Sequence, residues 1–83
     1  MKTPMQIIGK ISRTPKYPPG EIRRLMAKLD LSEKGFALLM NVSDKTVLLW
    51  AKGAARPCGS ARRLMQVYEL CPEVAGKLAG ADK

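Results

Sequence analysis

The chain contains no histidine, and aromatic residues make up only 5% of its 83 residues. The absence of histidine removes the commonest general base, the Ser–His nucleophile pair and most zinc-binding geometries. A chain of this length buries only about 60 to 65% of its unfolded surface, which leaves room for one compact domain without a deep substrate cavity. The sequence therefore favours a small binding module over an enzyme, and it predicts neither a metal nor a cofactor.

The chain has only two cysteines and no long apolar run, and both observations bear on its cellular location. Cys58 and Cys71 flank a predicted helix about 15 Å long, whereas a disulfide needs Cα atoms within about 7 Å. Two reduced thiols are typical of a cytosolic protein. The longest apolar stretches, Phe36–Met40 and Val47–Ala51, are far shorter than the roughly 20 residues that span a bilayer. We therefore expect a cytoplasmic protein with no membrane partner.

Acidic residues are outnumbered, since 15 lysines and arginines against 7 aspartates and glutamates give a net charge of +8. Half of this charge lies in residues 1–20, which hold four basic residues and no acid. Four of the six prolines lie there too and deny the segment a continuous helix. We predict a flexible, basic, proline-rich arm, in which only Met5–Ile11 is ordered, as a short strand or by folding onto a partner. Such an arm fits polyanion binding and a solubilising role equally well.

From Glu21 onward the apolar residues recur with the period of amphipathic helices. Ser32 and Ser43 suit helix N-caps, Gly53 suits a helix end, and Pro72 suits a first helical position. We predict helices over residues 21 to about 30, 33 to 40, 44 to 52, 60 to 71 and 72 to 79. The expected buried faces comprise Ile22, Leu25, Met26 and Leu29; Phe36, Ala37 and Met40; Val47 and Trp50; Ala61, Leu64, Met65 and Tyr68; and Val74 and Leu78. The predicted fold class is all-α.

The second and third predicted helices are short and are joined by Asn41–Val42–Ser43. Two such helices with a three-residue turn form the unit that places its second helix in the major groove of DNA. The small side chain of Ala37 allows the helices to approach closely, and an asparagine tolerates the left-handed conformation of the turn. Val47 and Trp50 would anchor the second helix of the unit from behind.

The run from Leu31 to Gly53, LSEKGFALLMNVSDKTVLLWAKG, resembles the helix-turn-helix signature of the Cro/C1 (Xre-type) repressors. The later run Arg56–Met65, RPCGSARRLM, followed by Cys71-Pro-Glu73, is similar to the branch that contains antitoxins of HigA type. The resemblance implies a five-helix lambda-repressor-like helix-turn-helix domain at residues 21–79, followed by a frayed tail at residues 80–83. It also implies a homodimer that binds double-stranded DNA at a palindromic operator.

The resemblance further implies which side chains meet DNA. Lys45 would donate to guanine O6 and N7, Asp44 would accept from cytosine N4, and Leu49 would pack on a thymine methyl group. The expected base contacts are Asp44, Lys45, Leu48 and Leu49, and the expected phosphate contacts are Ser43, Thr46, Lys52, Arg56 and Lys34. From the residues alone, Lys45 could equally be a solvated lysine on the surface. Leu48 and Leu49 could also belong to an extension of the core or to a protein-binding patch.

The chain departs from the family pattern at several positions. Glu33 stands where relatives usually carry a phosphate-binding glutamine, and Gly35 costs about 1 kcal/mol of helix stability. Arg62 and Arg63 are adjacent, so they cannot share one helix face. Either one of them contacts phosphate or a partner, or both lie on a solvated face or in an ion pair on the helix surface. Leucines replace polar or basic side chains at Leu38, Leu48 and Leu49, and Ala51 replaces the glutamate that commonly follows the tryptophan.

Two functions are compatible with these features. The first is a sequence-specific transcriptional repressor at the nucleoid, which the resemblance extends to an autoregulating antitoxin with a toxin protein as its partner. The second is a protein-interaction adaptor that kept the fold and lost specific DNA recognition, as Glu33, Asp44 and the leucines suggest. RNA binding is less favoured, because two of the four aromatic side chains are expected to be buried and unable to stack on bases.

Overall fold

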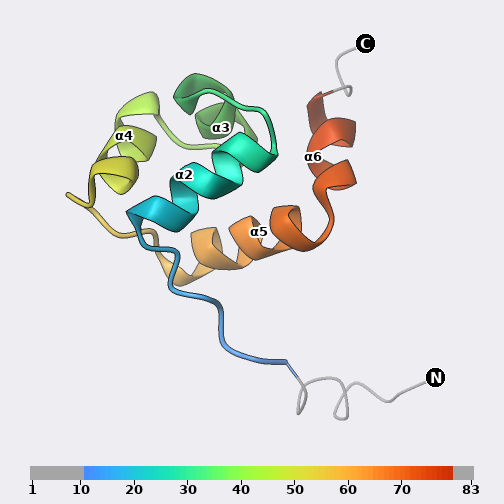
Figure 1. Ribbon diagram of the computed structural model, residues 1–83, viewed down its shortest axis with the longest axis horizontal. Coiled ribbons are helices and arrows are strands. Elements are labelled where there is room, and N and C mark those ends of the chain that lie inside the picture. The colour runs from blue at the N-terminus through green and yellow to red at the C-terminus, as the bar shows by residue number, and fades with distance from the viewer. Residues whose placement is uncertain (1–10, 80–83) are drawn as a thin grey trace.

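The computed structural model describes residues 11–79, which form five helices and no strand (Figure 1). The helices are α2 (Pro19–Lys28), α3 (Glu33–Met40), α4 (Asp44–Lys52), α5 (Gly59–Leu70) and α6 (Pro72–Ala79). The all-α fold class is therefore confirmed for this part of the chain. The predicted ordered segment Met5–Ile11 lies outside the described residues except for Ile11, which is exposed, and so does the predicted tail at residues 80–83.

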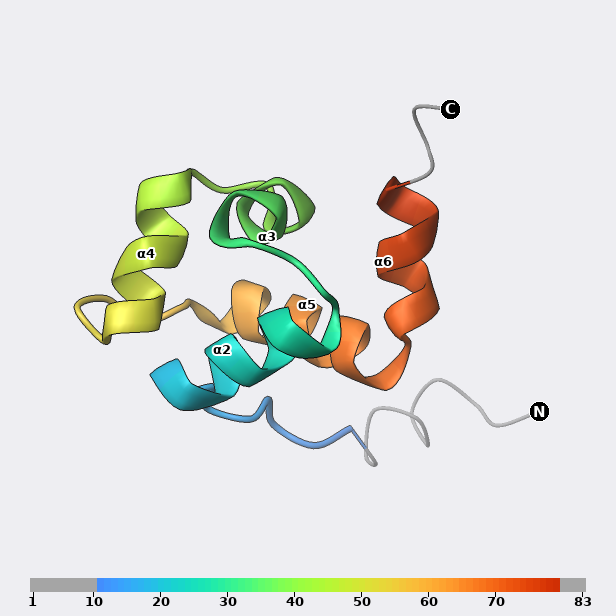
Figure 2. The same ribbon diagram turned by 45° about the horizontal axis from the view of Figure 1, so that its top comes forward.

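The helices surround one core, with α4 packed against both α2 and α3. Helix α5 runs along the other side of this core, and α6 turns away from its end to pack against α5 and α3 (Figures 1 and 2). The largest fully buried side chains are Ile22, Phe36, Val47 and Met65. Each comes from a different helix, so α2, α3, α4 and α5 are held together by a single apolar cluster.

Most helix ends lie where local signals predict them. Helices α3 and α4 have the expected bounds, and α6 begins at Pro72 as expected, while α5 begins one residue early, at Gly59. Cys58 and Cys71 are the N-cap and C-cap of α5 and are free thiols, as their positions at opposite helix ends predict. On α6, Val74 packs against the core as expected, but Leu78 is 51% exposed and Ala75 is buried instead.

The largest difference from expectation concerns the N-terminal segment. Helix α2 begins at Pro19 rather than at Glu21, because a proline at the first helical position has its φ angle already set for a helix. Tyr17, which was assigned to the flexible arm, is only 4% exposed and belongs to the core. All four aromatic side chains are therefore buried, not two.

Tyr17 adopts a left-handed backbone conformation with φ of 49°, which is a strained geometry for a bulky residue. Its hydroxyl donates a hydrogen bond of 2.6 Å to Oε1 of Glu69 on α5, which helps to hold it in place. Upstream, the Arg62 Nε donates to Thr14 Oγ1 and Arg63 donates to the Ser12 carbonyl. The two arginines thus hold the N-terminal segment against α5, a role that the sequence did not predict for either of them.

The surroundings of Tyr17 make the stability of the fold depend on pH in the alkaline range. Burial, and then the adjacent carboxylate, raise the pKa of Tyr17 well above its ordinary value of 10.0. The folded chain keeps this proton at a pH where the unfolded chain has lost it, so stability falls as the pH rises above about 10. Burial also raises the pKa of Tyr68, so Tyr17 accounts for only part of the decline.

We expect Tyr17→Phe to lower the free energy of unfolding at pH 7 by about 1 to 2 kcal/mol, because a hydrogen bond to a charged acceptor is lost. The same variant should show a shallower loss of stability as the pH rises above about 10. Urea denaturation followed by circular dichroism across this range measures both effects. An unchanged alkaline decline in the variant would contradict the assignment to Tyr17.

Candidate nucleic-acid interface

The turn between α3 and α4 is built from residues with defined local roles. Asn41 ends α3 in the left-handed conformation, with φ of 59° and ψ of 47°. The next backbone N–H, of Val42, donates to the Ala37 carbonyl at 3.0 Å and closes the helix end. Ser43 is already extended, so α4 starts in a new direction after only three residues.

The first turn of α4 is held by the hydroxyl groups of two residues that were expected to contact phosphates. Ser43 Oγ accepts from the Thr46 backbone N–H at 3.1 Å and lies 2.8 Å from Thr46 Oγ1. One of the two hydroxyl groups donates its hydrogen to the other oxygen, so the second hydroxyl hydrogen remains free to be donated to a phosphate oxygen. Asp44 is exposed in the same turn, where a negative charge stabilises a helix N-terminus.

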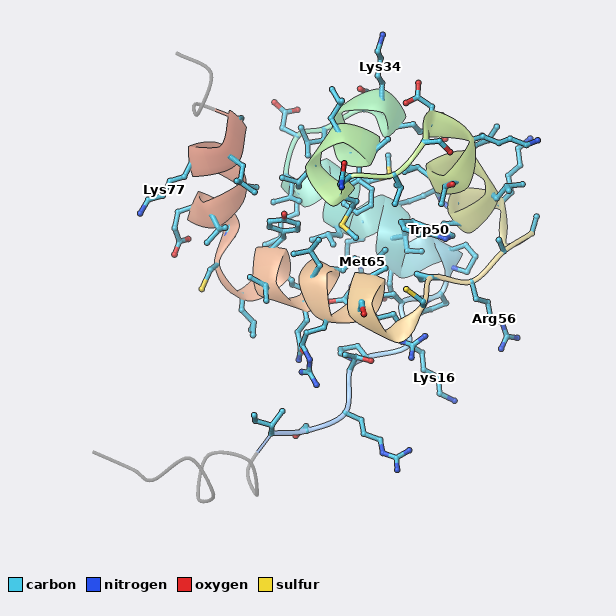
Figure 3. The ribbon with its side chains drawn as sticks, turned by 180° about the vertical axis from the view of Figure 1, so that it is seen from behind. Lys16, Lys34, Trp50, Arg56, Met65 and Lys77 are labelled. Carbon is cyan, nitrogen blue, oxygen red and sulfur yellow. The ribbon has the colours of Figure 1, made fainter. Side chains whose placement is uncertain are left out.

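The inner face of α4 consists of Val47, Trp50 and Ala51, which are 0%, 5% and 9% exposed. Anchoring by the first two is therefore confirmed, and Figure 3 shows Trp50 and Met65 within the interior between the helices. Because Ala51 is buried, a glutamate at this position would bury its carboxylate, which is costly. A small apolar residue at this position follows from the packing.

The C-terminal end of α4 is fixed by two further contacts. Gly53 supplies the left-handed C-cap, with φ of 79°. An Arg23 Nη1–H from α2 donates to the Ala51 carbonyl, where a cation also interacts favourably with the helix dipole. Arg23 was not predicted as a site residue, because it lies 28 positions from its partner and no local pattern marks it.

The outer face of α4 carries Lys45 and Lys52, both exposed. They are seven residues apart and therefore lie within about 20° of one line along the helix. Leu48 and Leu49 flank this line and are half-buried, but neither belongs to the core cluster or to the side chains packed on it. The interpretation of these leucines as an extension of the core is thus not supported, and part of each side chain is accessible beside the two lysines.

The remaining predicted phosphate contacts lie away from this line. In Figure 3, Lys34 projects from α3 and Arg56 projects from the loop that follows α4, and the two side chains point away from each other. Glu33, beside Lys34, is exposed in the first turn of α3. The structure therefore places the predicted residues along and around one exposed helix, without gathering them into a pocket.

Within residues 11–79, no three cysteine or carboxylate side chains lie close enough together to hold a metal ion. None of the helices in this range combines the length and apolar character needed to cross a membrane. No protein-family model matches the chain, and no curated protein sequence matches it.

The cap of α4 leads to a prediction about stability. Ser43→Ala should lower the free energy of unfolding by about 1 kcal/mol, because the Thr46 backbone N–H and hydroxyl both lose their partner. The matched control is Ser60→Ala, since Ser60 is exposed in the first turn of α5 and its hydroxyl makes no hydrogen bond within the described residues. Thermal unfolding of both variants tests this expectation, and equal melting temperatures would contradict it.

Proposed function

We propose that this protein is a sequence-specific DNA-binding repressor that inserts α4 into the major groove, with α3 and α4 acting as a helix-turn-helix. The observation that carries the proposal is the outer face of α4. Lys45 and Lys52 are exposed there, while the opposite face of the helix is anchored in the core. The resemblance to the Cro/C1 repressors supports the same assignment.

In this proposal the side chains near the start of α4 contact base edges, and those around it contact the backbone. Lys45 donates to guanine, with Asp44, Leu48 and Leu49 beside it as base contacts. The phosphate contacts are Ser43, Thr46, Lys52, Arg56 and Lys34. Because one half-site offers few contacts, the protein acts as a homodimer on a palindromic operator.

The resemblance to HigA-type antitoxins extends the proposal to autoregulation of an operon that also encodes a toxin, which this chain would neutralise. A small toxin-like reading frame next to the gene would support this extension. Its absence would remove the antitoxin assignment and leave the repressor assignment intact.

Charge reversal on α4 tests the repressor assignment. We expect Lys45→Glu to weaken binding to DNA from the protein's own promoter region by about tenfold or more, because a base contact becomes a repulsion. The matched control is Lys77→Glu on α6, which carries the same charge change on another exposed helix. Gel-shift titrations of both variants measure the difference, and equal losses would show that only net charge matters.

Salt dependence and sequence preference provide a second test. With roughly six phosphates neutralised per dimer, the logarithm of the affinity should fall with the logarithm of salt concentration at a slope near −5. Promoter DNA should bind more tightly than a random duplex at every salt concentration. Equal affinity for the two duplexes would contradict a sequence-specific repressor.

The alternative function is a protein-interaction adaptor. It is favoured by Leu38, which is 76% exposed on α3 and is a residue that a DNA-binding surface does not require. Lys45→Glu separates the two functions, because an adaptor would retain its partner in a pull-down while a repressor would lose its DNA.

A further inference from the structure

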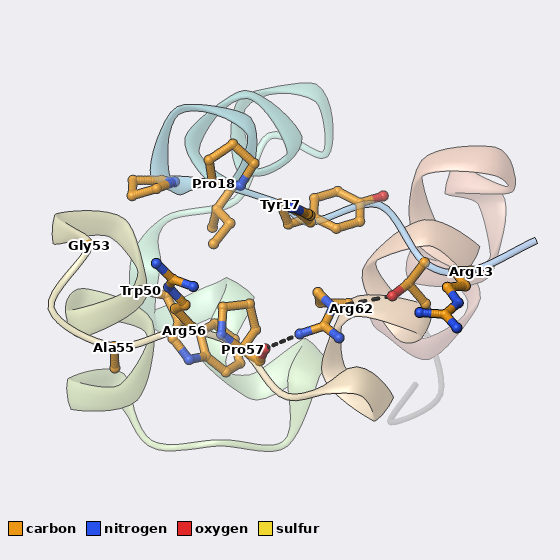
Figure 4. Close-up of a pocket in the computed structure, with 13 residues that line it drawn as sticks. Arg13, Tyr17, Pro18, Trp50, Gly53, Ala55, Arg56, Pro57 and Arg62 are labelled. Carbon is orange, nitrogen blue, oxygen red and sulfur yellow. Dashed lines mark hydrogen bonds between the residues drawn. The ribbon is translucent and has the colours of Figure 1, made fainter.

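A cavity of about 710 Å³ opens between the N-terminal segment, the loop that follows α4 and the start of α5 (Figure 4). Its walls come from residues 13, 14 and 16–19, from residues 53 and 55–57, and from Arg62, with Ile22 and Trp50 also lining it. This volume lies within the range of roughly 300 to 1,000 Å³ that is typical of small-molecule sites. We call this cavity the basic pocket.

The charge around the basic pocket is of one sign. Its lining includes Arg13, Lys16, Arg56 and Arg62, and no acidic side chain is among the described residues that line it. The ion pair found within residues 11–79 joins Arg24 to Glu21, which lie outside this lining. Four cations around one concavity, with no carboxylate among the residues that line it, create a positive potential that attracts anions.

Arg62 also makes the pocket rigid. Its Nε donates to Thr14 Oγ1 at 3.1 Å and its Nη1 donates to the Pro57 carbonyl at 2.8 Å, so it joins the two facing walls (Figure 4). Both acceptors are neutral, so the guanidinium charge is not compensated by either bond. With about five N–H donors available to an arginine, donors also remain for a ligand. A site already held in shape loses little conformational entropy when a ligand binds.

The other walls of the pocket are largely apolar. Tyr17 and Trp50 are 4% and 5% exposed, and Pro18, Pro19 and Pro57 lie beside them. Inorganic phosphate would use only the cations, and a DNA duplex, being convex, does not fill a concavity of this size. Cations together with apolar walls suit a ligand that has both an anionic group and an apolar body.

We propose that the basic pocket binds a small phosphate-bearing organic anion of about the size of a nucleoside monophosphate. Phosphate is favoured over a single carboxylate because three of the four cations are arginines, whose planar groups can contact a phosphate through two hydrogen bonds. This inference goes beyond the proposed repressor function and does not depend on it.

Trp50 gives a direct signal for the test, because it lines the basic pocket and is the one tryptophan of the chain. The full-length protein is titrated with AMP, with adenosine and with inorganic phosphate at constant ionic strength, and tryptophan fluorescence is recorded. We expect a saturable change with AMP at a concentration about tenfold lower than with either of the other two. No saturation by AMP, or equal binding of phosphate alone, would overturn the proposal.

Matched double variants locate the site. Arg13→Ala with Lys16→Ala removes two exposed cations of the pocket, and we expect AMP to bind about tenfold more weakly. Arg24→Ala with Lys77→Ala removes the same charge outside the pocket and should leave AMP binding unchanged. Equal losses in the two double variants would assign binding to the overall charge of the protein and overturn the proposal.

Neither double variant changes a residue of the proposed DNA-binding surface. DNA affinity is therefore measured on the same samples as an independent readout. A pocket that fails to bind AMP while specific DNA binding persists would refute this inference alone, and the reverse result would refute the repressor function alone.

Discussion

Burial of the inner face of α4 is the constraint on which the rest of the structure depends. Helices α3 and α4 have eight and nine residues, whereas an isolated helix in water needs about 12 to 15 residues to be even marginally stable. Both helices therefore exist because their apolar faces are buried together. Full burial of side chains such as Phe36 and Val47, each 0% exposed, contributes roughly 1.5 to 3 kcal/mol apiece. The outer face of α4 is presented to solvent as a consequence of this packing.

Polar contacts then determine the position of α4 and of the segments around it. The Ser43 cap holds the start of α4, and the hydrogen bond from Arg23 to Ala51 holds its end. On the opposite side of the core, Tyr17 and Arg62 join the N-terminal segment to α5 and to the loop after α4. These bonds connect segments that differ widely in sequence position, so they restrict the relative orientation of elements that apolar packing alone would leave adjustable.

The features that the sequence predicts well are those encoded within a few residues. Ser32, Asn41, Ser43 and Gly53 each act through a neighbour three to five positions away, and the bounds of α3 and α4 were predicted from such signals. Periodicity likewise identified Val47 and Trp50 as the inner face of α4, and hence identified the exposed face opposite.

Long-range contacts could not be predicted in this way. Tyr17 and Glu69 are 52 positions apart, and Arg62 and Thr14 are 48 apart, so neither pair has a local signature. A proline-rich basic segment has the composition of a flexible arm unless its contacts with α5 are known. The sequence alone therefore places Tyr17 outside the core. For the same reason the sequence did not reveal that Arg13, Lys16, Arg56 and Arg62 line one cavity.

The positions of the acidic residues sharpen the meaning of the net charge. Glu21 pairs with Arg24, and Glu69 accepts the Tyr17 hydroxyl, so both carboxylates act within the fold. Glu33 and Asp44 lie in the first turns of α3 and α4, where the helix dipole favours a negative charge. Their presence near the proposed DNA surface thus has a structural cause that requires no contact with a base. Lys45 and Lys52 on α4 and the four cations around the basic pocket form no ion pair with a carboxylate among the described residues, so their charges remain available to an anionic ligand.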